Sequence, residues 1–132
     1  MTSDVLAEIR DFYDAIATGD VARAQAKLDA GKIVITEAES LPFGGEYRGI
    51  DGFHKLMRNL GGAWKRVRFD NFVFATGENR VVSEFVMTAT VRTTGAELKF
   101  PVIEVFELSD GKIVSIRPFY WDTSAICKAF GV

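Results

Sequence analysis

The spacing of hydrophobic residues changes once along the chain, from a helical period to a strand period. Apolar residues recur every three or four positions over 5–16, 21–28 and 53–60, which predicts three amphipathic helices, the third capped by Asp51. From about residue 67 apolar and polar residues alternate, which predicts strands over 67–75, 80–91, 98–108 and 112–121. A short apolar run at 33–35 predicts another strand, and a last short helix ends near Phe130.

The connections between the later strands predict antiparallel hairpins. Thr94-Gly95 and Asp110-Gly111 separate these strands, and Asp-Gly is a strong hairpin sequence. Helices followed by such a meander predict an α+β domain in which the helices pack on one face of the sheet. The 132 residues contain no repeat, linker or low-complexity segment, so we expect one domain over 1–132.

Composition narrows the functional classes. Eleven phenylalanines favour thick packing between layers or an aromatic-lined cavity. The net charge is −2, and the only basic cluster, Lys65-Arg66-Val67-Arg68, is interpreted as a helix-to-strand connection, so we expect no nucleic-acid partner. No apolar stretch approaches the length of a membrane span and no leader is recognisable, so we expect a cytoplasmic protein without membrane contact.

Neither a metal nor a cofactor is expected. One cysteine, Cys127, and one histidine cannot form an all-His or Cys/His metal site within a single chain. No Gly-x-Ser-x-Gly motif is present, and Gly44-Gly45 leads into a strand rather than into a helix that could bind phosphate.

Several short motifs carry a family resemblance that covers essentially the whole chain. They are Leu41-Pro42-Phe43-Gly44-Gly45, Tyr47-Arg48-Gly49, Asp110-Gly111-Lys112-Ile113 and Phe119-Tyr120-Trp121-Asp122. With this order of elements the chain resembles the nuclear transport factor 2-like superfamily, and within it the SnoaL-like polyketide cyclase and ketosteroid isomerase branch. The resemblance implies a cone-shaped half-barrel, cystatin/nuclear transport factor 2-like, with a pocket between three N-terminal helices and a curved antiparallel sheet, often in a homodimer. It implies no single chemistry.

The same resemblance suggests that the ketosteroid isomerase machinery is largely missing. Its first-helix tyrosine falls on Phe12, with Tyr13 as the neighbour, and only its strand acid has a match, at Glu104. The other positions fall on apolar residues, namely Leu28, Met57 and, for the base, about Leu41. Steroid isomerisation by that machinery is therefore not expected.

Glu104 is the leading candidate for chemistry. Strand alternation places it on the face that carries Val102 and Phe106, an otherwise apolar row. A carboxyl group there should have a raised pKa and could act as general acid, base or hydrogen-bond donor. The alternatives are a bulge that turns Glu104 outward, or an arginine that neutralises it. Tyr120, on the neighbouring hairpin strand, is the expected partner.

Four polar residues are further candidates, each with a structural alternative. Tyr120 shares the inward phase of the last strand but could be a plain core aromatic. Asp122 could face the pocket mouth as a catalytic group, or only cap the last helix. Glu37, two residues before Glu39, could place a carboxyl in the pocket, or lie at a solvated strand end. His54 could contact substrate or lie at the edge of its helix's apolar stripe.

Aromatic residues are expected to complete the pocket and to build an interface. Tyr13, Trp64 and Phe106 are candidate walls, with ordinary core packing as the alternative. Arg117, Phe119 and Trp121 fall on the opposite sheet face, and an arginine with two large aromatics there is typical of an interface. We therefore expect a homodimer through this outer face, the alternative being a partly covered monomer surface.

The leading functional hypothesis is a cofactor-independent enzyme that performs acid/base chemistry on a small, largely apolar polyketide-, terpenoid- or steroid-like compound. Isomerisation, cyclisation and hydration are all compatible with it. Glu104 would be the principal acid/base, with Tyr120, Asp122 and Glu37 positioning polar atoms. The competing hypothesis is a non-catalytic ligand-binding or dimeric interaction module of the same fold. Two polar side chains converging on one spot of the pocket would favour the enzyme.

Overall fold

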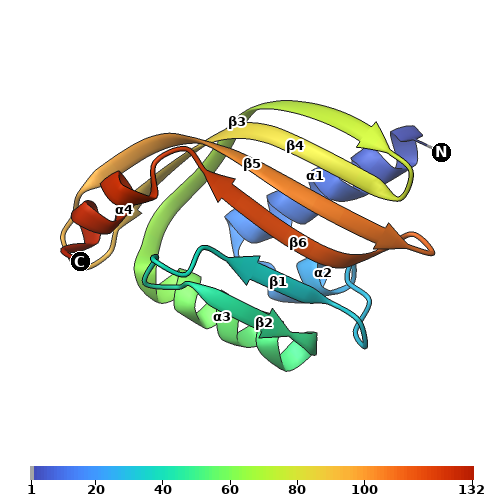
Figure 1. Ribbon diagram of the computed structural model, residues 1–132, viewed down its shortest axis with the longest axis horizontal. Helices are drawn as coiled ribbons and strands as arrows, with labels where there is room; N and C mark the ends of the chain where they lie inside the picture. The colour runs from blue at the N-terminus through green and yellow to red at the C-terminus, as the bar shows by residue number, and fades with distance from the viewer. Residues whose placement is uncertain (1) are drawn as a thin grey trace.

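A curved, mostly antiparallel sheet lies over two long helices (Figure 1). The computed structural model describes residues 2–132, with side chains from Asp4 onward. The elements are α1 (Thr2–Thr18), α2 (Val21–Gln25), β1 (Val34–Glu37), β2 (Gly45–Arg48), α3 (Gly49–Ala63), β3 (Trp64–Gly77), β4 (Arg80–Val91), β5 (Glu97–Ser109), β6 (Lys112–Tyr120) and α4 (Thr123–Phe130). The expected fold class is confirmed.

The described strands form one six-stranded sheet in the order β2-β1-β6-β5-β4-β3. Strands β3 to β6 are the antiparallel meander that the alternation predicts. Strand β1 instead joins parallel to β6, with Val34 opposite Ser115 and Ile35 opposite Ile116. A parallel neighbour needs a long crossover, and here α3 and the rest of the meander provide it. As a result, the end of β1 lies beside the end of β6.

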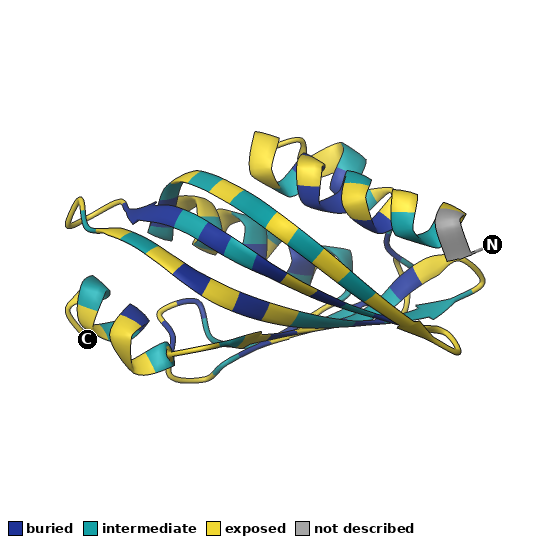
Figure 2. Ribbon diagram, turned by 90° about the horizontal axis from the view of Figure 1, so that it is seen from above, coloured by how far each residue is buried: buried dark blue, intermediate teal, exposed yellow. Residues whose placement is uncertain are grey.

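The alternation along β5 and β6 determines which side chains face the helices, and burial changes from residue to residue along the strands (Figure 2). Ile116 and Pro118 are buried, whereas Arg117 and Phe119, which alternate with them along the strand, are exposed. The predicted phase of the last strand is therefore confirmed. The Asp110-Gly111 hairpin is confirmed as well: both residues have positive φ, 51° and 76°, as a tight two-residue hairpin turn of type I′ requires.

Two bulges bend β3 along its length. Its pairing with β4 shifts register between Lys65 and Arg68 and again between Asp70 and Val73. Arg66 and Asn71 adopt left-handed backbone conformations at these points, with φ of 56° and 62°. An extra residue on one strand bends that strand and increases its twist. The bulges therefore give the sheet a concave inner side.

The helices fill this concave side with their apolar faces. α1 buries Ile9 and Phe12, and α3 buries Phe53 and Leu56. α1 contacts α2 and β3, while α3 packs against β1, β2 and β3. Within the described residues, no helix is both long and apolar enough to cross a membrane.

Local details of α2 and α3 differ from the sequence prediction. α3 begins at Gly49, before Asp51, and no side chain caps its start, so Asp51 lies in the first turn instead of capping it. α3 also continues through Gly61 and Gly62 to Ala63, and α2 ends at Gln25. Tertiary packing of α3 across the sheet outweighs the low helix propensity of these two glycines.

Candidate active site

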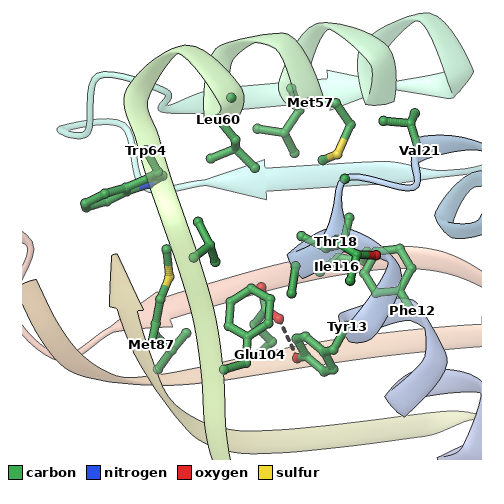
Figure 3. Close-up of a pocket in the computed structure, with 18 of the residues that line it drawn as sticks. Phe12, Tyr13, Thr18, Val21, Met57, Leu60, Trp64, Met87, Glu104 and Ile116 are labelled. Carbon is green, nitrogen blue, oxygen red and sulfur yellow. Dashed lines mark hydrogen bonds between the residues drawn. The ribbon is translucent and has the colours of Figure 1, made fainter. Parts of the chain in front are cut away.

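A cavity of about 410 Å³ lies between α1, α3 and the concave side of the sheet (Figure 3). Its wall is mostly apolar, and Leu60 and Met57 from α3 lie across it from Tyr13 and Glu104. Exposed wall residues such as Thr18, where α1 ends, mark its opening to solvent. This volume is within the range of small-molecule sites in proteins.

Three polar side chains meet at one point, where Tyr13 and Glu104 line the cavity and Ser83 is buried behind them. The Tyr13 hydroxyl from α1 donates a hydrogen bond to Oε1 of Glu104 on β5. The same hydroxyl is 2.5 Å from Oγ of Ser83 on β4. Because the tyrosine proton points to Glu104, the Ser83 hydroxyl donates to the tyrosine oxygen. Tyr13 is 3% exposed and Ser83 is fully buried, so this group is shielded from bulk water.

The Tyr13 ring is held in place by other aromatic rings. Edge-on or tilted contacts at centroid distances of 4.8–5.7 Å join it to four phenylalanines, Phe69, Phe72, Phe85 and Phe106. Such aromatic pairs contribute about 1 kcal/mol each beyond area burial. The hydroxyl of Tyr13 is therefore fixed by its ring as well as by its hydrogen bonds.

A second acid and a second tyrosine lie on the same wall. Glu37 ends β1, Tyr120 ends β6, and the Tyr120 hydroxyl donates to Glu37 Oε1 at 2.7 Å. Glu37 is only 4% exposed, although Thr36 before it and Glu39 two residues after it are exposed. The parallel pairing of β1 with β6 creates this contact.

Both acids have a pKa near neutrality. Burial raises the pKa of Glu104 to about 7, although the hydrogen bond from Tyr13 opposes this shift. Burial also raises the pKa of Glu37 to about 8, with a smaller contribution from the charge of Glu104, while the hydrogen bond from Tyr120 opposes it. Glu104 is half-buried because its carboxyl faces the cavity, but the surrounding wall is apolar. Each carboxyl can therefore exchange a proton near pH 7.

The two tyrosines remain protonated donors. Burial raises the pKa of the Tyr13 phenol well above its usual value, and the charge of Glu104 raises it further. Burial and the charges of Glu37 and Glu104 do the same for the pKa of Tyr120. At neutral pH both hydroxyls are therefore hydrogen-bond donors to the acids rather than bases.

The structure brings most of the predicted site residues together. Glu104, Glu37, Tyr120, Tyr13 and Trp64 all line the cavity. Their location agrees with the sequence analysis, whereas their chemical roles stay predictions.

Three other predicted site residues do not line the cavity. Asp122 is exposed and its Oδ1 accepts the Ala125 amide at 3.0 Å, because β6 ends at Tyr120 and Asp122 caps α4. His54 lies off the apolar face of α3, and its Nε2 is 2.6 Å from Gln25 Oε1. Phe106 is fully buried in the core, where it packs against Phe12 and Tyr13.

Two features of the site differ from the sequence prediction. The expected partner of Glu104 was Tyr120, but Glu104 lies opposite Pro118 in the β5–β6 ladder, and its partner is Tyr13. Ser83 was not predicted as part of the site, although a polar residue in the inward row of Val81 and Phe85 on β4 indicates a buried hydrogen bond.

The comparisons with known proteins agree with this architecture. The sequence profile of the SnoaL-like domain matches residues 9–116. The chain therefore belongs to the SnoaL-like domain family. A search of curated proteins finds no match.

Solved structures with the same nuclear transport factor 2-like fold cover nearly the whole chain. One, from Burkholderia thailandensis, is 27% identical with a TM-score of 0.84, covering 96% of both chains. TerC, co-crystallised with polyporic acid, is 15% identical with a TM-score of 0.86, covering 97% of this chain and 98% of its own. A candidate polyketide cyclase from Xanthomonas campestris is 18% identical with a TM-score of 0.80, covering 95% of both chains.

Proposed function

We propose that this protein is an acid/base enzyme that needs no cofactor and that isomerises, cyclises or hydrates a small, largely apolar compound. The observation that carries the proposal is that Tyr13 and Glu104, joined by a hydrogen bond and supported by the buried Ser83, line an apolar cavity. A carboxyl with a pKa of about 7 suits proton transfer at neutral pH, because substantial fractions of acid and base are then present together.

In this proposal Glu104 removes a proton from an acidic C–H bond of the substrate. Tyr13 occupies Oε1, and the contacts described for residues 2–132 leave Oε2 of Glu104 without a hydrogen bond, so that oxygen is the basic atom. The electron pair left on the substrate is delocalised onto an adjacent carbonyl, as in an enol or enolate. Return of the proton at another carbon completes an isomerisation. In a cyclisation the enolate carbon instead bonds to a second carbonyl carbon of the same substrate, the π bond of that carbonyl breaks, and its oxygen takes up a proton. In a hydration Glu104 takes a proton from a water whose oxygen bonds to one carbon of a conjugated C=C bond, and the neighbouring carbon is protonated.

Glu37 is the complementary proton donor. Its pKa of about 8 keeps most of it protonated at pH 7, whereas Glu104 is about half ionised. Both face the same cavity, so one can donate while the other accepts. Tyr120 holds Glu37 Oε1 and leaves the other oxygen to carry the proton.

The cavity supports an apolar, ring-containing substrate. Its wall carries aromatic and aliphatic side chains such as Phe53, Leu60 and Met87, and its volume suits a molecule of a few fused rings. TerC, which shares the fold, was crystallised with polyporic acid, and this likeness supports a small-molecule ligand.

Deuterium exchange at acidic C–H bonds tests the proposal without knowledge of the substrate. Proton NMR in D₂O would follow a panel of cyclic ketones and β-diketones with catalytic amounts of protein. Wild-type protein should accelerate exchange for members that fit, and Glu104→Gln should reduce the acceleration about a hundredfold. Glu84→Gln, an exposed change on β4, is the control. Equal acceleration by Glu104→Gln and wild type would refute the role of Glu104.

A non-catalytic binding module is the second candidate function. The observation that favours it is that each acid already has a tyrosine donor without any ligand. Such a module would retain a small molecule on purification and release it unchanged. Mass spectrometry of the protein before and after denaturation would identify that molecule, and its chemical conversion by the protein would exclude the module.

We also propose that the outer face of β5 and β6 forms a homodimer interface. Trp121 is 82% exposed, Phe119 is 52% exposed and Ile103 is 43% exposed. The Arg117 guanidinium lies 5.4 Å from the centre of the Phe119 ring. A second copy of the chain would cover these aromatics, and exposed aromatic and arginine side chains are enriched in such interfaces.

A further inference from the structure

The charged residues of the cavity wall are segregated by sign. Besides the two acids, the wall contains three charged residues, Lys65, Arg66 and Arg92, and all three are cations. Arg66 and Arg92 are exposed and Lys65 is half-buried, so they belong to the rim of the cavity. Of the two acids, Glu37 is 4% exposed and lies in the protein interior, and Glu104 is half-buried.

Among the residues that the structure describes, none of these three cations forms an ion pair with a carboxylate. The nearby Arg68, by contrast, is paired with Asp70 at 2.7 Å. Arg92 donates from Nε and Nη2 to the carbonyls of Gly61 and Trp64, at 3.0 and 3.2 Å. These bonds fix its guanidinium where α3 meets β3 without neutralising its charge.

The first bulge of β3 explains how two consecutive residues reach the same wall. In a regular strand, Lys65 and Arg66 would point to opposite faces of the sheet. The register shift between Lys65 and Arg68 and the positive φ of Arg66 break this alternation. The bulge thus adds a cation to the rim that a regular strand would direct away, and bulges recur next to active sites for this purpose.

We propose that the cavity selects a ring-containing organic carboxylate, whose carboxylate lies at the rim formed by Lys65, Arg66 and Arg92. The apolar body then extends toward Tyr13 and Glu104. This orientation keeps the ligand's negative charge away from the two acids and beside unpaired cations. The inference deepens the proposed function by naming the substrate class, and it rests on that function for the reacting end.

A matched pair of probes tests the charge preference. 2-Naphthoate and 2-naphthamide have nearly the same shape and differ in charge. The chain has three methionines, and the methyl groups of Met57 and Met87 line the cavity, so ¹³C-methyl NMR reports binding at this site. At low salt 2-naphthoate should bind about tenfold more tightly, and 0.5 M NaCl should remove most of the difference because it screens exposed charges.

Variants locate the preference at the rim. Lys65→Gln with Arg66→Gln should weaken 2-naphthoate about fivefold or more and leave 2-naphthamide unchanged. Lys32 and Lys99 are exposed and lie outside the cavity wall. The double variant Lys32→Gln with Lys99→Gln removes the same amount of charge and should alter the affinity for neither probe. Equal affinities for the two probes, equal weakening of both, or no methyl shift with either would overturn the proposal.

The outcome is separable from that of the proposed function. Glu104→Gln should keep the preference for 2-naphthoate, because Glu104 is not part of the rim. A missing preference with Glu104-dependent deuterium exchange intact would reject only the carboxylate ligand. A retained preference with exchange that does not depend on Glu104 would reject only the acid/base role.

Discussion

Ser83 and Glu104 occupy directly opposite positions in the β4–β5 ladder, and both contact the hydroxyl of Tyr13. Strands β4 and β5 therefore hold the Ser83 hydroxyl and the Glu104 carboxyl at a fixed spacing, and α1 supplies the Tyr13 hydroxyl. The sheet thereby orients a helix-borne tyrosine toward the acid. The same three residues also link the stability of the fold to the titration of Glu104.

Replacing Tyr13 by Phe should raise the pKa of Glu104 above about 7. The hydrogen bond from Tyr13 stabilises the carboxylate and so opposes the effect of burial, and Phe removes it. The pH midpoint of deuterium exchange should move upward with it. Tyr47→Phe is the matched control, because Tyr47 is equally buried but its hydroxyl bonds Phe43 and Asn59 outside the cavity. A lower or unchanged midpoint in Tyr13→Phe would contradict the assigned hydrogen bond.

Stability should fall as pH rises from about 4.5 to about 8. An acid with a raised pKa in the folded state binds its proton more tightly there than in the unfolded chain. Its contribution is complete below the unfolded pKa of about 4.5 and is lost by the folded pKa, about 7 for Glu104 and about 8 for Glu37. For Glu104 the loss is about 3 kcal/mol.

Glu104→Gln should reduce this pH dependence, since Gln does not titrate. Urea unfolding would give the free energy of unfolding of both proteins at pH 5 and at pH 8. The difference, variant minus wild type, should be more positive at pH 8 than at pH 5. Glu84→Gln, exposed on the same sheet, should leave the wild-type profile unchanged. A wild-type stability that rises steadily over this pH range would contradict the assigned pKa shifts.

Gly44→Ala should destabilise the loop that follows Glu37. A Cβ at Gly44 would lie 2.3 Å from the Ala38 carbonyl oxygen, and the other nearest atoms are backbone atoms of Glu39, which cannot shift easily. We expect a loss of at least about 2 kcal/mol in the free energy of unfolding. Gly62→Ala provides the contrast, because a Cβ there meets nothing within 4 Å inside α3. That change should stabilise by about 0.5–1 kcal/mol, and thermal melts would show whether the two variants shift in opposite directions.

Trp121→Ser should convert the proposed dimer into a monomer. Trp121 is the most exposed aromatic side chain of the outer face, so its removal should cost the interface a central anchor while leaving the cavity intact. Sedimentation at tens of micromolar should show a dimer for wild type and a monomer for the variant. Val73→Ser, also exposed but on β3, is the control. A monomeric wild type under these conditions would reject the interface.

Local patterns determine much of the fold and part of the site. The change of period predicts the order of helices and strands, and the alternation along β6 predicts that Ile116 is buried and Arg117 exposed. The apolar row around Glu104 predicts that its carboxyl faces the cavity. These properties depend on neighbours two to four residues away, which a sequence displays directly.

The pairings between distant residues could not be predicted in this way. Tyr120 meets Glu37 only because β1 joins β6 in parallel, and no local pattern specifies that neighbour. Tyr13 meets Glu104 because α1 packs at a particular rotation over the sheet. For Asp122 the sequence left two readings, a group at the pocket mouth or only a helix cap, and the structure shows the cap because β6 ends at Tyr120.

The most direct test of the central claim is the titration of the Glu104 side-chain carboxyl by ¹³C NMR, with Glu104→Gln used to assign its signal. The account predicts a midpoint of about pH 7, far above the ordinary glutamate pKa of about 4.3, because the carboxyl faces an apolar cavity. A midpoint of about 4.5 would show that the carboxyl is hydrated like a surface group, and it would contradict Glu104 as the acid/base of this site.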